Sequence, residues 1–303
     1  MKQDMYKGIF PALYTCYDNE GKVSVKRTQA LAEMLINKGC KGLYVGGSSG
    51  ECIYLTVEER KELLDGVMQV VGDRATIIAH VACNNTMQSM ELAKHAESVK
   101  VNAIAAIPPI YFHLSDAAIA KYWNDISSAA SNTDFIIYNI PALAGVALSR
   151  SLLKEMCKNP RVIGVKNSSM STEDIQRFKA IGGENFVVFN GPDEQYIAGR
   201  AIGAIGGIGG TYGAMPELFL AMEKYMQKGD FVNAQVIQNK VNDIITLLCS
   251  GTGSMYAMIK QVLLINEGLD CGGVRKPLPS LTKEDEEIAK KCATSIKQAV
   301  SEL

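Results

Sequence analysis

A lysine at the end of an apolar segment is the residue of this sequence with the clearest chemical potential. The segment "RVIGVKNSSMS", residues 161–171, places Val162, Ile163 and Val165 just before Lys166, a pattern typical of a buried strand. Burial disfavours the ammonium form, and the free amine can then attack a ketone to form a Schiff base. A surface lysine whose ammonium reaches solvent is the alternative. Because no carboxylate lies within four residues of Lys166, we predict the Schiff-base role.

A tyrosine ends the apolar segment that precedes the lysine segment. Tyr138 lies in "FIIYNIPALAGV", and a strand next to that of Lys166 would place its phenol beside the amine. There it can relay protons during carbinolamine dehydration and carbon–carbon cleavage. The alternative is an aromatic side chain that only packs.

A glycine-rich turn with two hydroxyls, "GGSSGE" at residues 46–51, is a candidate for binding a substrate carboxylate. The exposed amides around Gly47 and the hydroxyls of Ser48 and Ser49 would bind the anion, although glycines also serve any tight strand-to-helix turn. The later "GAIGGIGGTYG" does not predict a dinucleotide site, because Tyr212 stands where a third glycine is needed and the segment follows the last strand.

Metal chemistry has little support among the three histidines. We expect His95 on the surface of a helix, while His80 and His113 could face the site but have no defined carboxylate partner. We therefore predict neither a metal nor a cofactor, and a metal-dependent aldolase using His80 and His113 remains an alternative.

The elements that must position these residues alternate between short apolar segments and helical periodicity. About eight such pairs in some 220 residues predict a (β/α)8 barrel, with an open doubly wound sheet as the alternative. In a barrel the carboxyl ends of the strands meet at one mouth, which would bring the candidate residues together. We predict a barrel over residues 1–229 and a helical extension packed on it over residues 230–303. The predicted strands cover residues 8–15, 42–47, 76–82, 102–108, 135–141, 162–168, 186–191 and 204–210.

Composition narrows the class of protein. The 303 residues include 31 basic and 32 acidic side chains, for a formal net charge of −1, which favours neither nucleic acid nor an anionic membrane as a partner. No run of about 18 apolar residues or signal-peptide pattern occurs. The eight cysteines are scattered without a CxxC pair, which is typical of reduced thiols in a cytoplasmic protein.

Four motifs, read together, resemble one enzyme family. "GLYVGGSSGE", "YNIPALAGV", "GVKNSS" and "NGPDE" occur in the order found in the pyruvate-dependent class I aldolases, the family of N-acetylneuraminate lyase and dihydrodipicolinate synthase. The resemblance runs from "GIFPALYTCYD" to "RKPLPSLT". It implies Lys166 as the Schiff-base lysine, Tyr138 as the proton relay with Ser48, and Ser48 and Ser49 as carboxylate ligands. It also implies that Tyr111 reaches the active site of an adjoining subunit, in a homotetramer.

The same motifs favour the lyase branch of the family. The synthases usually carry an arginine two residues after the proline of the fifth-strand motif, whereas Leu143 follows Pro141 at that distance here. The resemblance implies that the lyase branch binds its polyol substrate through the set Ser168, Gly191, Asp193, Glu194 and Gly210.

Gly210 is a departure, since lyases commonly have serine there, and a hydroxyl contact to the sugar would be lost or replaced by water. The expected activity is cleavage of sialic acid to N-acetylmannosamine and pyruvate. The alternatives are another 2-keto-acid aldolase or hydro-lyase of the family, such as dihydrodipicolinate synthase or a keto-deoxy sugar acid aldolase, and a non-catalytic sugar-acid binder.

Overall fold

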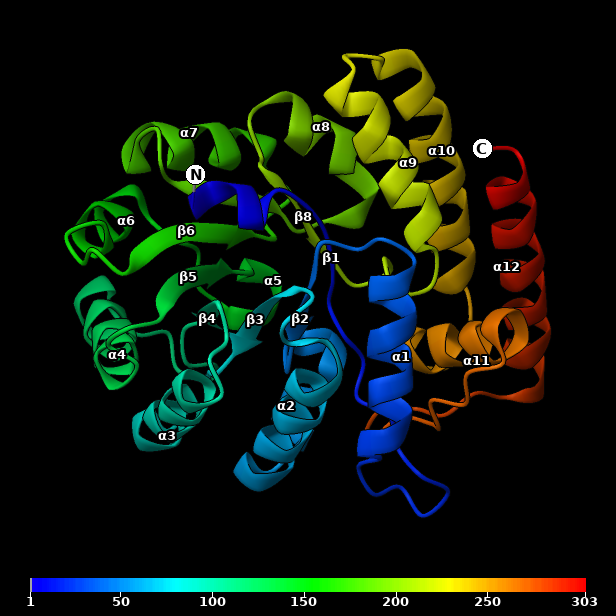
Figure 1. Ribbon diagram of the computed structural model, residues 1–303, viewed down its shortest axis with the longest axis horizontal. Helices are drawn as coiled ribbons and strands as arrows, with labels where there is room; N and C mark the ends of the chain where they lie inside the picture. The colour runs from blue at the N-terminus through cyan, green and yellow to red at the C-terminus, as the bar shows by residue number, and fades with distance from the viewer. Residues whose placement is uncertain (1) are drawn as a thin grey trace.

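Eight short parallel strands form a ring at the centre of the molecule (Figure 1). The computed structural model describes residues 2–303. The strands follow the order β1-β8-β7-β6-β5-β4-β3-β2. Backbone hydrogen bonds from Lys41 to Ile9 and from Leu13 to Tyr44, both 2.9 Å, join the two ends, so the predicted barrel is confirmed over the open sheet. The strands are β1 (Gly8–Pro11), β2 (Gly42–Val45), β3 (Thr76–His80), β4 (Ala103–Ala106), β5 (Asp134–Asn139), β6 (Val162–Asn167), β7 (Val187–Asn190) and β8 (Gly206–Gly209).

Helices surround the ring, and several have side-chain caps at their N-termini. Thr56 and Thr282 both form capping boxes, with Glu59 and Asp285 as their partners, and the Ser24 hydroxyl caps α1. The helices of the barrel are α1 (Val25–Asn37), α2 (Val57–Val71), α3 (Thr86–Ser98), α4 (Asp116–Ala129), α5 (Pro141–Ala144), α6 (Arg150–Met156), α7 (Thr172–Gly182), α8 (Tyr196–Ala201) and α9 (Pro216–Gln227), with 3₁₀ turns η1 (Lys2–Tyr6), η2 (Ser48–Gly50), η3 (Cys52–Tyr54) and η4 (Asp193–Gln195).

Side chains fill the barrel, so it is a packed core with a site at one end. Phe10, Tyr44, Ile136 and Phe189 point inward from different strands and are fully buried, as expected for layers of inward-facing residues. The observed strands are shorter than the predicted ones. Apolar residues such as Leu13 continue past the strand ends into buried loops, and an apolar pattern does not mark where the ladder of hydrogen bonds stops.

Three further helices gather on one side of the barrel, beside α9 (Figure 1). These are α10 (Phe231–Leu248), α11 (Met255–Glu267) and α12 (Lys283–Ser301), which confirms the predicted helical extension. The proposed boundary at 229/230 falls in the turn between α9 and α10, and its role as a division between two domains stays a prediction. Within residues 2–303, no helix is both long and apolar enough to cross a membrane.

Candidate active site

Lys166 and Tyr138 lie side by side because their strands pair in register. Residues 138 and 166 are direct partners across β5 and β6. The Nζ of Lys166 lies 4.0 Å from the ring centroid of Tyr138 and 4.4 Å from that of Tyr44. Only 5% of Lys166 is exposed, so its amine is held between two aromatic rings at the carboxyl end of the barrel.

The burial of this amine changes its acid–base chemistry. Loss of hydration lowers the pKa of Lys166 from its usual 10.5 to about 7, although the negative charge of Asp193 acts in the opposite direction. About half of the side chains are therefore neutral near pH 7. The amine that Schiff-base chemistry requires is available without a separate base.

The phenol of Tyr138 is connected to two hydroxyl groups. Burial raises its pKa to about 12, while hydrogen bonds with the hydroxyls of Ser48 and Ser168 partly offset that rise. At neutral pH the phenol is protonated and can donate. The arrangement is a short chain of exchangeable protons beside the amine, which is suited to acid–base catalysis.

The glycine-rich turn after β2 brings its hydroxyls to the same place. An added Cβ at Gly47 would lie 2.5 Å from the ring of Tyr44, so only glycine lets the backbone cross this ring closely. The turn then forms η2, which carries Ser48 and Ser49. The Ser49 hydroxyl hydrogen-bonds the Tyr256 hydroxyl at 3.3 Å.

Asp193 is a buried carboxylate whose two oxygens differ in their hydrogen bonds. Its Oδ2 accepts hydrogen bonds from the backbone N–H and the hydroxyl of Thr211, both at 2.6 Å. Its Oδ1 is buried and has no hydrogen-bond partner among residues 2–303, which is unusual for a buried polar atom. Burial raises the pKa of Asp193 to about 6, against the lowering effect of Thr211. The neighbouring Glu194 is exposed.

Two glycines border the site closely. A Cβ on Gly191 would lie 2.0 Å from the Oγ of Ser168, so this close approach requires glycine. At Gly210 a Cβ would lie 3.2 Å from the Oγ of Ser49 and 4.0 Å from the hydroxyl of Tyr256. The position where related enzymes were expected to carry serine is thus bordered by two hydroxyls from other elements.

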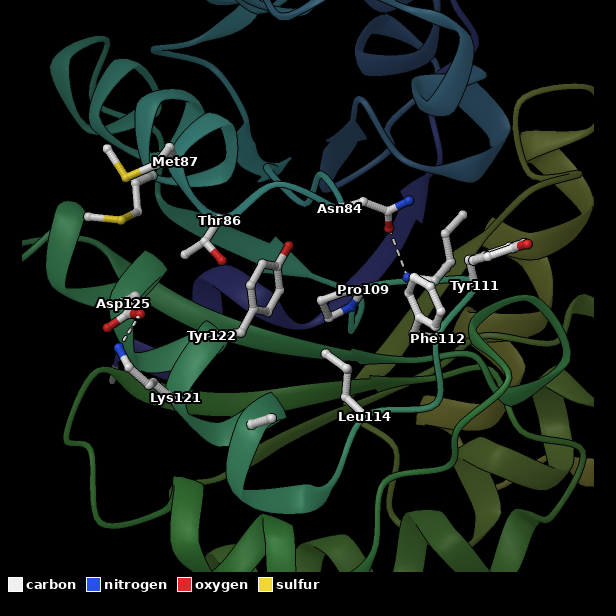
Figure 2. A pocket seen from close by; sticks show the side chains of 13 residues that line it. Asn84, Thr86, Met87, Pro109, Tyr111, Phe112, Leu114, Lys121, Tyr122 and Asp125 are labelled. Carbon is white, nitrogen blue, oxygen red and sulfur yellow. Dashed lines mark hydrogen bonds and ion pairs between the residues drawn. The ribbon is translucent and has the colours of Figure 1, made fainter.

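Tyr111 lies outside this cluster. It is 87% exposed, has a φ of 84° and stacks edge-to-face on Phe112. Figure 2 shows both rings on the loop between β4 and α4, where they border a cavity of about 820 Å³ that also includes Asn84 and Tyr122. The expected role of Tyr111 in an adjoining subunit therefore stays a prediction about an assembly of several copies.

The histidines take structural positions. His80 is buried, its Nδ1 lies 2.9 Å from the carbonyl oxygen of Gly46, and its Nε2 accepts from the backbone N–H of Ile107 at 3.4 Å. Burial lowers the pKa of His80 well below its usual range. His95 pairs with Asp65 at 2.8 Å, and His113 is exposed. In the part of the chain that the structure describes, no three His, Cys, Asp or Glu side chains group as metal ligands.

Several residues of the site were not found from the sequence. Tyr44 lies within the segment "GLYVGGSSGE" and Thr211 within "GAIGGIGGTYG", but neither segment indicates a role for these two side chains. Tyr256 lies on α11, far along the chain from the turn it contacts. Its position depends on how the extension packs on the barrel, for which the sequence contains no local signal.

Comparisons with known proteins show the family to which this chain belongs. The model of the dihydrodipicolinate synthetase family matches residues 5–298. An N-acetylneuraminate lyase of Mediterraneibacter gnavus is 59% identical over 97% of this chain and 93% of its own length. An N-acetylneuraminate lyase of Citrobacter koseri is 32% identical, covering 91% and 92% of the two chains.

Solved structures of the same family have a closely similar fold. A wild-type sialic acid aldolase of Ruminococcus gnavus superposes with a TM-score of 0.97 at 58% identity, covering 98% of this chain and 99% of that one. A dihydrodipicolinate synthase of Bacillus anthracis superposes with a TM-score of 0.90 at 26% identity, covering 96% and 98%. The fold, the matched length and the identities lead to one conclusion: this chain belongs to the dihydrodipicolinate synthetase family.

Proposed function

We propose that this chain is a sialic acid lyase, which cleaves N-acetylneuraminate reversibly into N-acetylmannosamine and pyruvate through a Schiff base on Lys166. The observation that carries the proposal is the buried amine of Lys166, with a pKa of about 7, beside the phenol of Tyr138. The N-acetylneuraminate lyase that is 59% identical over nearly the whole chain supports the substrate.

The proposed reaction begins on the open-chain ketone of the substrate. The neutral amine of Lys166 adds to C2, and the resulting carbinolamine loses water when Tyr138 donates its proton to the departing hydroxyl. The product is an iminium ion, which is the electron sink of the reaction. The Tyr138 phenolate then takes the proton of the C4 hydroxyl, the C3–C4 bond breaks, and its electron pair moves toward the iminium nitrogen.

The second half of the reaction regenerates the enzyme. N-acetylmannosamine leaves, and the phenol of Tyr138, which has regained a proton from the C4 hydroxyl, donates it to C3 of the enamine to give a new iminium ion. Water then adds to C2 and gives a proton back to the Tyr138 phenolate, and the carbinolamine collapses to pyruvate and the free amine. No external cofactor is needed in this scheme, because the lysine itself accepts the electron pair.

Substrate binding is proposed to use both ends of the site. The hydroxyls of Ser48 and Ser49, with the amides near Gly47, would hold the carboxylate next to C2. At the other end, the unpartnered Oδ1 of Asp193 would accept a hydrogen bond from a hydroxyl of the polyol. Ser168, Gly191, Glu194 and Gly210 would line the remaining surface.

Borohydride trapping tests the reaction class. Pyruvate followed by borohydride should attach a reduced pyruvyl group to Lys166, detectable as a mass increase on the peptide that contains it. The Lys166→Met variant should show no adduct. If the unaltered chain gains no mass under these conditions, neither a Schiff-base lyase nor any other class I aldolase describes it, and a binding protein becomes the better reading.

The choice of substrate within the family needs a separate comparison. Asp193→Asn should reduce kcat/KM about 10- to 100-fold for a long polyol substrate. The substitution alters the buried carboxylate that would accept a hydrogen bond from a hydroxyl of the polyol. It should have a smaller effect on a short 2-keto acid that does not reach Asp193. Equal losses on both would favour another 2-keto-acid aldolase over a sialic acid lyase.

We also propose a homotetramer in which Tyr111 completes the site of a neighbouring copy, and a cytoplasmic location consistent with the scattered free thiols. The exposed rings of Tyr111 and Phe112 support a covered surface in the assembly. Mixing an inactive Lys166→Met chain with a Tyr111→Ala chain should restore part of the activity, because mixed assemblies contain sites with both native residues. Exchange of subunits without any recovery would refute the shared site.

A further inference from the structure

Glu51, the last residue of the glycine-rich turn, forms a buried ion pair with a lysine of the C-terminal extension. The Oε1 of Glu51 lies 2.8 Å from the Nζ of Lys260 on α11, and the two side chains are 0% and 1% exposed. The Oε2 of Glu51 accepts from the hydroxyl of Tyr17 at 3.1 Å and from the backbone N–H of Arg275 at 2.8 Å. Both carboxylate oxygens are therefore satisfied by parts of the chain outside the turn.

Lys260 is satisfied in the same way. Its Nζ also donates to the carbonyl oxygen of Gly273 at 2.7 Å and lies 4.6 Å from the ring centroid of Tyr17. A buried charge pair is tolerated when its remaining hydrogen-bonding capacity is used, and removing one partner leaves an uncompensated charge. The pair thus holds the turn against the C-terminal extension in one position.

The backbone at Glu51 links this anchor to the hydroxyls of the site. Glu51 has the left-handed conformation, with φ 58° and ψ 31°, and its N–H donates to the carbonyl oxygen of Ser48 at 3.0 Å. A non-glycine residue adopts this conformation only when its surroundings fix it. This capping bond connects the backbone of Glu51 directly to Ser48, so a shift of Glu51 would be transmitted to Ser48–Gly50.

A second contact from the same helix supports this arrangement. Tyr256 and Lys260 are four residues apart and therefore lie on one face of α11. Tyr256 contacts the hydroxyl of Ser49 and Lys260 contacts the carboxylate of Glu51. Helix α11 of the extension thus contacts the glycine-rich turn at two places, Ser49 and Glu51.

We infer that Glu51 is a positioning residue, which the extension uses through Lys260 to place the hydroxyls of Ser48 and Ser49 for proton relay and carboxylate binding. The inference rests on the proposed function. The two are separable, because absence of borohydride trapping in the unaltered chain defeats the proposed function, whereas the test below compares variants that are trapped.

The test measures turnover per trappable site. Turnover per labelled site is kcat divided by the fraction of chains that pyruvate and borohydride label. In Glu51→Gln this quantity should fall about 10- to 100-fold, as expected for a small misplacement of catalytic groups. A purely structural role would reduce the number of labelled sites and leave the turnover of each one unchanged. The double variant Glu51→Gln/Lys260→Met removes the unpaired ammonium, so it should regain stability without regaining turnover.

Two further variants control the experiment. Glu223→Gln alters another buried carboxylate, on α9, which pairs with the guanidinium of Arg200 and accepts a hydrogen bond from the hydroxyl of Tyr196. The turnover per labelled site of this variant should match that of the unaltered chain. Tyr17→Phe removes one hydrogen-bond donor to Glu51 and leaves the Glu51–Lys260 ion pair in place. If Glu51→Gln does not fold, this variant tests the positioning role instead, and its turnover per labelled site should fall a few-fold.

Two results would overturn the inference. The first is a turnover per labelled site in Glu51→Gln that equals that of the unaltered chain, or the same result in Tyr17→Phe if Glu51→Gln does not fold. The other is recovery of turnover together with stability in the double variant, which would show that the pair only supports the fold.

Discussion

Replacing Lys166 by methionine should abolish activity and yet make the folded protein more stable. The unfolded chain hydrates the ammonium group fully, whereas the folded chain holds it between the rings of Tyr44 and Tyr138. Methionine has a similar length and no charge, so it fits the same space without the cost of desolvating a cation.

The size of this effect follows from the pKa. A fall from 10.5 to about 7, at about 1.4 kcal/mol per pH unit, corresponds to about 5 kcal/mol. Between these two pH values the unfolded state binds more protons than the folded state, so the stability of the unaltered chain rises with pH. Below about pH 7 both states are protonated and the full penalty is present; above about 10.5 it vanishes.

The assay is urea unfolding of both chains at several pH values between about 7.5 and 9.5. The stability advantage of Lys166→Met should shrink by about 1.4 kcal/mol for each pH unit. Asp193, with a pKa of about 6, stays ionised in this range and does not contribute to the slope. The slope is more informative than the absolute difference, since it is independent of how well methionine packs.

A matched control uses a lysine on the surface. Lys290 on α12 has a 60% exposed side chain, and its hydrogen bond with Glu287 raises its pKa, so Lys290→Met should change stability by the same amount across this pH range. If the difference in unfolding free energy between Lys166→Met and the unaltered chain is also independent of pH, the reasoning is refuted. Lys166 would then be protonated in the folded state like an ordinary lysine.

Three further predictions concern activity. Tyr138→Phe should lower kcat about 100- to 10,000-fold, the usual contribution of acid–base catalysis, in steady-state assays. The value of kcat/KM should fall about tenfold between pH 8 and pH 6, because the neutral fraction of Lys166 falls as pH drops through its pKa of about 7. Gly191→Ala should raise KM and lower kcat at least about tenfold, since the new Cβ would lie 2.0 Å from the Oγ of Ser168 and 2.7 Å from the carbonyl oxygen of Asn167.

Each of these has a contradicting result. A Tyr138→Phe variant within tenfold of native kcat would assign the proton transfers to another group. A flat pH profile between 6 and 8 would mean that the ionisation of Lys166 does not limit the reaction. Native kinetics in Gly191→Ala would show that the backbone relaxes and that close approach at this position is not required.

Much of the fold and the central pair of the site followed from local patterns. Apolar segments alternating with helical periodicity predicted the barrel. Consecutive strands that are neighbours in a parallel barrel place Tyr138 beside Lys166, as the register of β5 and β6 confirms. The resemblance to the family also implied the lyase branch, because Leu143 stands where the synthases usually carry arginine.

The function of Glu51 could not be seen in the same way. In the motif "GGSSGE" it resembles any acidic residue near the N-terminus of a helix. Its partner Lys260 lies 209 residues later, in an amphipathic helix. The same holds for Tyr256 and for the hydrogen bonds of Thr211 with Asp193, which depend on the final path of the chain.

The sequence by itself determined which residues have the right chemistry and which faces of the elements are buried, because apolar periodicity acts over a few neighbouring residues. Only the tertiary structure decided how completely Lys166 is shielded from water and which oxygen of Asp193 has no hydrogen-bond partner among residues 2–303. It also decided that the extension contacts the glycine-rich turn. Desolvation and long-range contacts depend on every group that surrounds a site, and those groups come from segments that meet only after the barrel has closed and the last helices have packed on it.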